Sequence, residues 1–180
     1  AMGMAYAMAQ IGFWNKLTAH PASDTFWSGQ AIDRILGKLP LSVPMLLVHG
    51  LWDQEDIYGP MAVYKALKPK DTGNDMVYLV IGPWHHGQQL EPGDHLGAIR
   101  FGSDTGTYFQ EHILAPFLAH YLQDDAPPNP VAPVTAFRTG TNQWERLQAW
   151  PAGCSQGCSI QPTPLYLHAG DTAGFDAPSA

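Results

Sequence analysis

Residues 43–87 read VPMLLVHGLWDQEDIYGPMAVYKALKPKDTGNDMVYLVIGPWHHG and decide the fold. Two short apolar runs, residues 43–49 and 76–81, each lead through a glycine into a cluster of ionisable side chains. Gly59 and Pro60 lie between them and mark the start of a helix, because proline is tolerated in the first helical turn. Short continuous apolar runs are typical of strands that are covered on both faces, as in a parallel sheet. The stretch therefore predicts a β-α-β unit and an α/β fold.

The sequence before this unit predicts helices. Aromatic and aliphatic residues recur at helical spacing between residues 5 and 39, with a break at HPASD, residues 20–24. Two helices joined by a turn fit this pattern, and Asp24, or Ser23 before it, suits the N-cap of the second helix. We expect residues 1–40 to form part of a helical cap over the sheet.

The sequence after the unit changes character once. Residues 105–123 carry apolar side chains at helical spacing and predict a helix that is kinked near Pro116. The proline-dense stretch at residues 126–133 leads into short runs with alternating polarity, which are typical of strands. We expect residues 41–125 to belong to the α/β domain and residues 126–180 to begin an all-β domain that is truncated.

The composition narrows the classes of function. Nine Lys and Arg residues against 16 Asp and Glu residues give a net charge of −7, and no basic cluster is present, so a nucleic acid partner is not expected. No apolar run reaches the roughly 18 residues that a membrane-spanning helix needs, so no membrane span is expected. The first residues lack the cationic start of a signal peptide, and we expect the sequence to be a fragment.

Cys154 and Cys158 are the only cysteines, and they are close in sequence. They can close a small disulfide or remain reduced, and a metal site is less favoured because no His or other Cys is near them in the sequence. A disulfide would favour an oxidising compartment, and we expect a periplasmic or secreted protein.

Ionisable side chains follow both predicted strands. Asp53 comes shortly after the first strand and His86 after the second. Ligands of open parallel sheets bind at the carboxyl ends of the strands, so these two side chains are expected at the same edge of the sheet. An acid followed by a histidine is also the second half of the Ser, Asp, His chain order of the α/β-hydrolases. The pair therefore predicts the acid and the base of a catalytic triad.

Four segments carry a resemblance to a known family. GLWDQEDIYG (residues 50–59) and GPWHHG (residues 82–87) resemble the α-amino-acid ester hydrolases, which are bacterial serine hydrolases related to X-Pro dipeptidyl peptidases, cocaine esterases and glutaryl acylases. FWNKLTAHPASDTFW (residues 13–27) is similar to the helical cap of this family. TAFRTGTNQWERLQAWP (residues 135–151) is similar to the opening of its C-terminal jelly roll.

The resemblance implies a partial α/β-hydrolase fold with a helical cap segment, followed by the start of a jelly roll. It implies that Asp53 is the triad acid and His86 the general base. We expect no cofactor and no metal. It also implies that Glu55 and Asp56 belong to a carboxylate cluster that binds the α-ammonium group of a small α-amino ester or β-lactam substrate. Two opposite unit charges about 4 Å apart attract each other by about 4 kcal/mol at an intermediate dielectric constant. Such a cluster therefore supplies the opposite charge that a cationic amine needs when it leaves water.

The nucleophile of that family is missing from this sequence. No serine lies in a Gly-x-Ser-x-x-Gly pattern, so we expect the chain to supply only the acid and the base and to be inactive alone. Its expected partner is the N-terminal half of the same enzyme, which would carry the serine. Pairing with a second copy would also cover an exposed sheet edge, so a homo-oligomer is expected.

Other interpretations remain open for each of these residues. Asp53 could cap the helix that follows, and Glu55 and Asp56 could serve only the dipole of that helix. His85 is expected to pack or face solvent, and His49 to be a core residue or to support the site from behind. Trp52 and Trp84 could wall a substrate pocket or only pack. A metal site is not favoured at His85, His86, His95 and Asp94, because their spacing in the sequence is not that of metal ligands on one element.

Other functions also remain open. The same fold could serve a neutral ester or an X-Pro dipeptide amide as substrate. The chain could also be an inactive fragment or a non-catalytic binding module.

Overall fold

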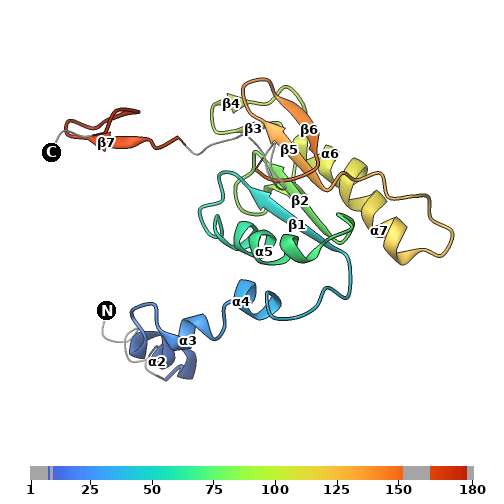
Figure 1. The fold of residues 1–180 in the computed structure, drawn as a ribbon. Helices are drawn as coiled ribbons and strands as arrows, with labels where there is room; N and C mark the ends of the chain where they lie inside the picture. Colours follow the sequence, from blue (N-terminus) through green and yellow to red (C-terminus); the bar gives the residue numbers. More distant parts are fainter. Residues whose placement is uncertain (1–7, 9, 152–162, 178–180) are drawn as a thin grey trace. The chain divides into compact units, whose positions relative to one another are not determined.

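The computed structural model describes Met8, residues 10–151 and residues 163–177 (Figure 1). The chain divides into two compact units, Ala1–Leu147 and Gln148–Ala180. Cys154 and Cys158 lie outside the described residues, so their disulfide stays a prediction. The described elements of the first unit are α2 (Gly12–Ala19), α3 (Thr25–Ser28), α4 (Ile32–Leu36), β1 (Met45–Gly50), α5 (Gly59–Leu67), η1 (Lys68–Lys70), β2 (Val77–Gly82), η2 (Gln88–Leu90), β3 (His95–Leu96), β4 (Ile99–Arg100), α6 (Thr105–Phe109), η3 (Gln110–Leu114), α7 (Ala115–Leu122), β5 (Val134–Arg138) and β6 (Gln143–Leu147).

The predicted β-α-β unit is confirmed by β1, α5 and β2. The two strands are parallel neighbours, with Met45 opposite Val77 at one end and Gly50 opposite Gly82 at the other. Pro60 lies in the first turn of α5, where its missing N–H leaves no helical hydrogen bond unmade. The carboxyl ends of both strands therefore meet at one edge of the sheet.

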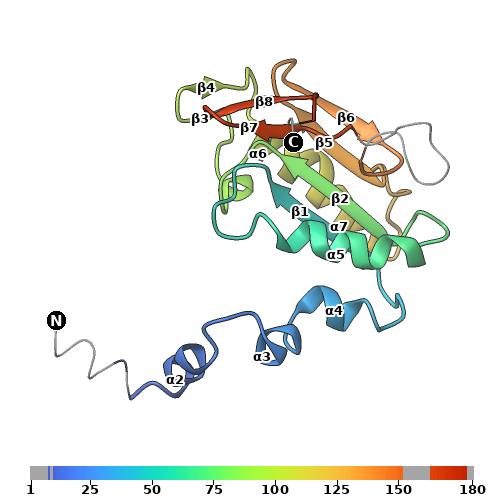
Figure 2. The same ribbon diagram turned by 60° about the vertical axis from the view of Figure 1, so that its left-hand side comes forward.

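Helices cover both faces of this sheet, as the continuous apolar runs predicted. Figure 2 shows α5 on one face and the α6–α7 segment on the other. Tyr78 and Val80 of β2 pack in one core cluster with Phe109 and Phe117 from the α6–α7 side. Every residue of β2 is buried, because the strand lies between two neighbouring strands and two helical layers.

Residues 105–122 form one helical segment whose middle turn is a π-helix. The sequence predicted this helix, and α6, η3 and α7 follow one another without a gap. Pro116 lacks an N–H, and its ring crowds the carbonyl group four residues earlier, that of His112 in η3. A wider turn relieves this contact, and a π-helical turn precedes the position at which the sequence predicted a kink.

The described part of the N-terminal segment contains three short helices. Asp24 caps α3 as predicted, because its side chain accepts a hydrogen bond from the Phe26 amide at 2.8 Å. Gly29 ends α3, so the predicted second helix is divided into α3 and α4. The Lys70 ammonium group donates to the carbonyl oxygens of Leu36 and Leu39, which lie at and after the end of α4. The role of this segment as a cap stays a prediction.

The strands after the proline-dense stretch extend the first sheet. The strand order is β1-β2-β5-β6, with β5 parallel to β2 and antiparallel to β6. The sequence placed a domain boundary at residue 126, whereas the compact units divide after Leu147. The alternating pattern of these strands identified them as strands but not as members of the same sheet. In the second unit, β7 (Tyr166–His168) and β8 (Thr172–Gly174) form an antiparallel hairpin, and the jelly roll stays a prediction.

One buried carboxylate holds the turn that leads into β2. Asp71 accepts hydrogen bonds from the amides of Met76 and Val77, at 3.2 and 2.9 Å, and from the Lys68 ammonium group at 2.7 Å. Burial opposes ionisation of the carboxyl group, but these donors outweigh it and hold the pKa of Asp71 below its ordinary value. The sequence indicated only a polar turn at this place.

Among the residues that the structure describes, no helix combines the length and the hydropathy that a membrane span requires.

Replacing Asp71 by Asn should lower the free energy of unfolding by about 3 kcal/mol at neutral pH, because it leaves Lys68 without its buried partner. The pKa of Asp71 is lowered on folding, so this stabilisation exists above the ordinary carboxyl pKa and is lost as the pH falls through the folded value. Urea unfolding at neutral and acidic pH measures both effects. Asp75→Asn, at an exposed position of the same turn, is the control and should change stability by less than about 0.5 kcal/mol.

Candidate active site

The loops after β1 and β2 are joined by backbone hydrogen bonds beyond the ends of the strands. The Leu51 amide donates to the Gly82 carbonyl at 2.9 Å, and the Trp52 amide donates to the Trp84 carbonyl at 3.0 Å. Gly50 allows this approach, since a Cβ atom there would lie 2.7 Å from the Trp84 carbonyl oxygen. Asp53 and His86 each lie within two residues of these contacts.

The Asp53 carboxylate is held in one orientation by its own loop. Its Oδ1 atom accepts hydrogen bonds from the amides of Glu55 and Asp56, both at 2.8 Å. Aspartate forms such turns because its short side chain reaches amides two and three residues ahead. The hydrogen bond from the Asp56 amide is the largest of the effects that lower the pKa of Asp53 below its ordinary value. The hydrogen bonds with the Glu55 amide and with His86 also lower this pKa.

His86 faces this carboxylate with one ring nitrogen. Its Nδ1 atom lies 3.0 Å from Oδ2 of Asp53 and 3.3 Å from Oδ1. Its Nε2 atom points away from Asp53 and lies 4.0 Å from a carboxylate oxygen of Glu55. The hydrogen bond to Asp53, and then the negative charges of Asp53 and Glu55, raise the pKa of His86. This geometry leaves Nε2 available to accept a proton from a third group.

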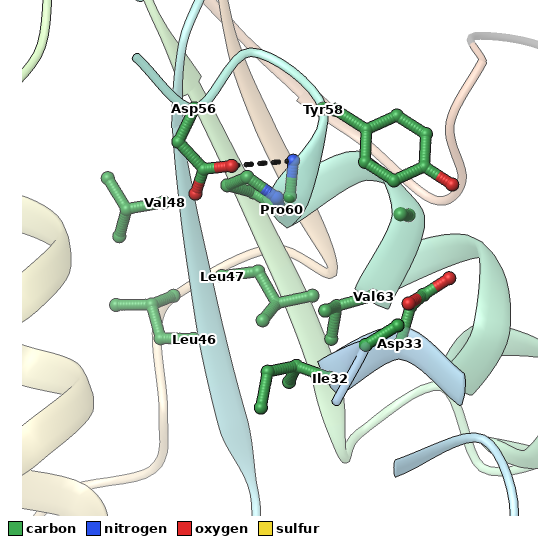
Figure 3. Close-up of a pocket in the computed structure, with 12 residues that line it drawn as sticks. Ile32, Asp33, Leu46, Leu47, Val48, Asp56, Tyr58, Pro60 and Val63 are labelled. Atoms are coloured by element: carbon green, nitrogen blue, oxygen red, sulfur yellow. Dashed lines mark hydrogen bonds between the residues drawn. The ribbon is translucent and has the colours of Figure 1, made fainter. Parts of the chain in front are cut away.

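The two further acids differ in their surroundings. Glu55 is exposed and approaches His86. Asp56 is also exposed, and its Oδ1 accepts a hydrogen bond from the Gly59 amide at 2.9 Å, at the start of α5 (Figure 3). Asp56 thus forms a hydrogen bond with the start of α5, which is the helix-terminal role that was the alternative interpretation.

A pocket of about 580 Å³ lies next to Asp56 (Figure 3). Its walls are mainly apolar and come from α4, β1 and α5, including Ile32, Leu47 and Val63. Asp33 is the second carboxylate of its lining. Neither Asp53 nor His86 is among the lining residues, so the pocket adjoins Asp56 rather than the Asp53–His86 pair.

The other candidate residues, Trp52, Trp84 and His49, differ in how deeply they are buried. Trp84 is fully buried and packs in the core, whereas Trp52 exposes 48% of its surface. His49 is buried, as expected, and its Nδ1 atom has no hydrogen-bond partner among the described residues. Burial, opposed by the charges of Asp53 and Asp56, lowers the pKa of His49.

Two histidines near the site pair locally. His85 turns its Nδ1 atom to the carbonyl oxygen of His86 at 2.9 Å, so it does not compete for Asp53. His95 pairs with Asp94 at 2.7 Å. Within the described part of the chain, no group of three or more His, Cys, Asp or Glu side chains is arranged to hold a metal ion.

Sequence reasoning missed two residues that shape the His86 loop. The buried Gln88 side chain accepts a hydrogen bond from the His85 amide at 3.2 Å and donates to the His95 carbonyl at 2.8 Å. Thr105 accepts a hydrogen bond from the Trp84 indole at 2.9 Å. A buried glutamine has no sequence signal, whereas Asp104 followed by Thr105 carries the signal of a helix start.

Comparisons with known proteins find one matching family profile and similar solved structures. The sequence profile of the X-Pro dipeptidyl-peptidase (S15) family matches residues 2–88, which include both Asp53 and His86. A search of curated proteins returned no match.

Among solved structures, a selenomethionine-labelled α-amino acid ester hydrolase is 44% identical over 98% of this chain, with a TM-score of 0.89. An aminopeptidase from a marine sediment Thaumarchaeota archaeon is 44% identical over 99% of the chain, with a TM-score of 0.87. The chain spans 29% and 28% of the lengths of these two proteins.

Replacing Asp53 by Asn should lower the pKa of His86 toward the value of about 6.5 of a free imidazole, because the partner charge is lost. The pH dependence of carbethoxylation of His86, resolved from His85 by peptide mass spectrometry, measures this change. Asp94→Asn removes a carboxylate that pairs with another histidine and should leave the pKa of His86 in place. An unchanged pKa in Asp53→Asn would contradict the observed pairing.

Proposed function

Because this chain belongs to the X-Pro dipeptidyl-peptidase (S15) family, we propose that it carries the acid and the general base of a serine hydrolase acting on α-amino acid derivatives. The substrates would be esters and amides of α-amino acids, including β-lactams with an α-amino acyl side chain. The observation that supports this most directly is the contact between Asp53 and Nδ1 of His86 at the carboxyl ends of two parallel strands.

The proposed chemistry follows from the two ring nitrogens. Asp53 holds the Nδ1–H tautomer and stabilises the imidazolium ion, so Nε2 takes the proton of a serine hydroxyl as that oxygen attacks the substrate carbonyl. The serine would come from another part of the protein, since no serine of these 180 residues lies in the Gly-x-Ser-x-x-Gly pattern of that family. The acyl group would then pass from serine to water or to an amine such as a β-lactam nucleus.

The names of the two relatives support a substrate with a free amino group. An α-amino acid ester and the substrate of an aminopeptidase both carry an α-ammonium group beside the scissile carbonyl. Glu55 and Asp56 offer two exposed carboxylates within three residues of Asp53. A cation that leaves water needs an opposite charge, and these acids would supply it.

The aminopeptidase relative favours a second candidate substrate, the amino-terminal residue of a peptide. Both candidates share the proposed ammonium site and differ in the leaving group, which is an alcohol in one and an amine in the other. Comparing kcat/KM of the full-length protein for an amino acid ester and for the matching dipeptide decides between them.

The catalytic pair is tested in the full-length protein by replacing His86 with Gln. Loss of the general base should reduce kcat by about 10³-fold or more with little change in KM, because the base acts on the transition state. His85→Gln is the matched control, since His85 is adjacent but does not contact Asp53, and it should keep most of the activity. Equal activity of His86→Gln and the wild type would exclude the proposal.

The ammonium site is tested by Asp56→Asn and Glu55→Gln. Each should reduce kcat/KM for an amino ester by about 10-fold or more and leave kcat/KM for the neutral ester of the same size nearly unchanged. Asp33→Asn, a carboxylate of the adjoining pocket, is the control. A parallel loss on both esters would show that the acids serve only the loop and the helix end.

A further inference from the structure

The peptide segment that presents His86 is held at its start by a buried side chain. Trp84 lies two residues before His86 and is completely buried. Its indole N–H donates to the Thr105 hydroxyl oxygen at 2.9 Å, and this hydroxyl donates to the Gly93 carbonyl at 2.7 Å. Thr105 is also completely buried. The indole nitrogen, the hydroxyl and the carbonyl form one chain of hydrogen bonds without exposed members.

The same Trp84 residue holds the loop that carries Asp53. Its carbonyl oxygen accepts the hydrogen bond from the Trp52 amide, next to Asp53 in the sequence. The position of Trp84 therefore affects both members of the candidate catalytic pair.

Close packing leaves Trp84 little room to move. A Cβ atom on Gly82 would lie 2.2 Å from the indole ring, so the ring covers the backbone at the end of β2. A Cβ atom on Gly93 would lie 2.4 Å from the Thr105 hydroxyl and 3.1 Å from the indole nitrogen. Glycine at both positions lets the backbone reach the ring and the hydroxyl.

Thr105, whose hydroxyl accepts the hydrogen bond from Trp84, is the first residue of α6, and hydrogen bonds of Asp104 fix this helix start. Asp104 caps α6 through the Thr107 amide at 2.9 Å, and the same Oδ1 atom accepts a hydrogen bond from the Gly93 amide at 2.9 Å. Thr105 follows Asp104 directly. Two hydrogen bonds therefore connect the start of α6 to Gly93. One runs from the Gly93 amide to Asp104, and the other from the Thr105 hydroxyl to the Gly93 carbonyl oxygen.

We propose that Thr105 is a positioning residue for His86: its hydroxyl holds the Trp84 indole, and Trp84 sets the placement of the His86 segment against the Asp53 loop. Without the hydroxyl, the buried indole N–H loses its acceptor and the ring shifts or turns to recover one. A displacement of about 1 Å at the base is enough to slow a reaction by about 100-fold, because the reacting atoms must be aligned.

The test uses Thr105→Val, which keeps the shape of the side chain and removes the hydroxyl. In the full-length protein, the pKa of His86 should move down toward that of free imidazole, because the contact with Asp53 is weakened. The acid limb of kcat/KM should move to lower pH, and kcat should fall about 10- to 100-fold with KM nearly unchanged.

Matched variants separate this role from general stability. Thr105→Ser keeps the hydroxyl and should keep the pKa of His86 and the pH profile of the wild type. Thr107→Val makes the same change two residues later, where the exposed hydroxyl donates to Asp104, and should also behave as the wild type. Trp84→Phe removes the donor instead of the acceptor and should reproduce the change seen in Thr105→Val.

Two results would overturn the proposal. One is a lower melting temperature of Thr105→Val and Trp84→Phe with an unmoved pKa of His86, which would make the hydrogen bond purely structural. The other is the same shift in Thr105→Ser, which would assign the effect to packing. This inference rests on the proposed function only for its kinetic part, because carbethoxylation of His86 reports its pKa in the absence of any substrate.

Discussion

The parallel pairing of β1 with β2 is the constraint on which the candidate site depends. Gly50 lies opposite Gly82, and two backbone hydrogen bonds continue the pairing past the strand ends. A shift of the register by one residue would turn every side chain of a strand to the other face and break the core that Tyr78 and Val80 form with the helices. The same register therefore determines the core and the distance between Asp53 and His86.

Polar side chains form hydrogen bonds with backbone groups that the strands and helices leave unpaired. Asp71 satisfies the amides at the start of β2, Asp24 and Asp104 those at helix starts, and Lys70 the carbonyl groups after α4. An unpaired buried backbone group costs free energy comparable to a lost hydrogen bond. These side chains lie in or next to the connections between strands and helices, so particular residues determine these connections as much as they determine the strands.

The sequence was sufficient to predict the elements that follow a strong local pattern. The continuous apolar runs predicted β1 and β2, and Gly59 with Pro60 predicted the start of α5. The proximity of Asp53 and His86 followed from the rule that parallel strands end at one edge. The membership of β5 in the same sheet could not be predicted, because strand partners far apart in the sequence leave no local pattern.

The supporting residues of the site were also beyond local patterns. Thr105 contacts Trp84 across 21 positions of the sequence, and nothing around either residue identifies the other. The buried side chains of Gln88 and Asp71 read as loop residues, because polar residues between periodic segments usually face solvent. Burial of a polar side chain depends on the packing of several distant segments, which only the three-dimensional structure supplies.

The carboxylate of Asp53 has two roles: it shapes the turn of its own loop and it contacts His86. Oδ1 accepts the amides that shape the loop, while Oδ2 gives the shorter contact to the imidazole. A glutamate would place its carboxylate one methylene group further from the backbone and would lose the two amide bonds even if it reached the histidine. For enzyme engineering, the acid and its turn are therefore one transferable unit. Grafting the acid alone onto another scaffold would leave its orientation undetermined.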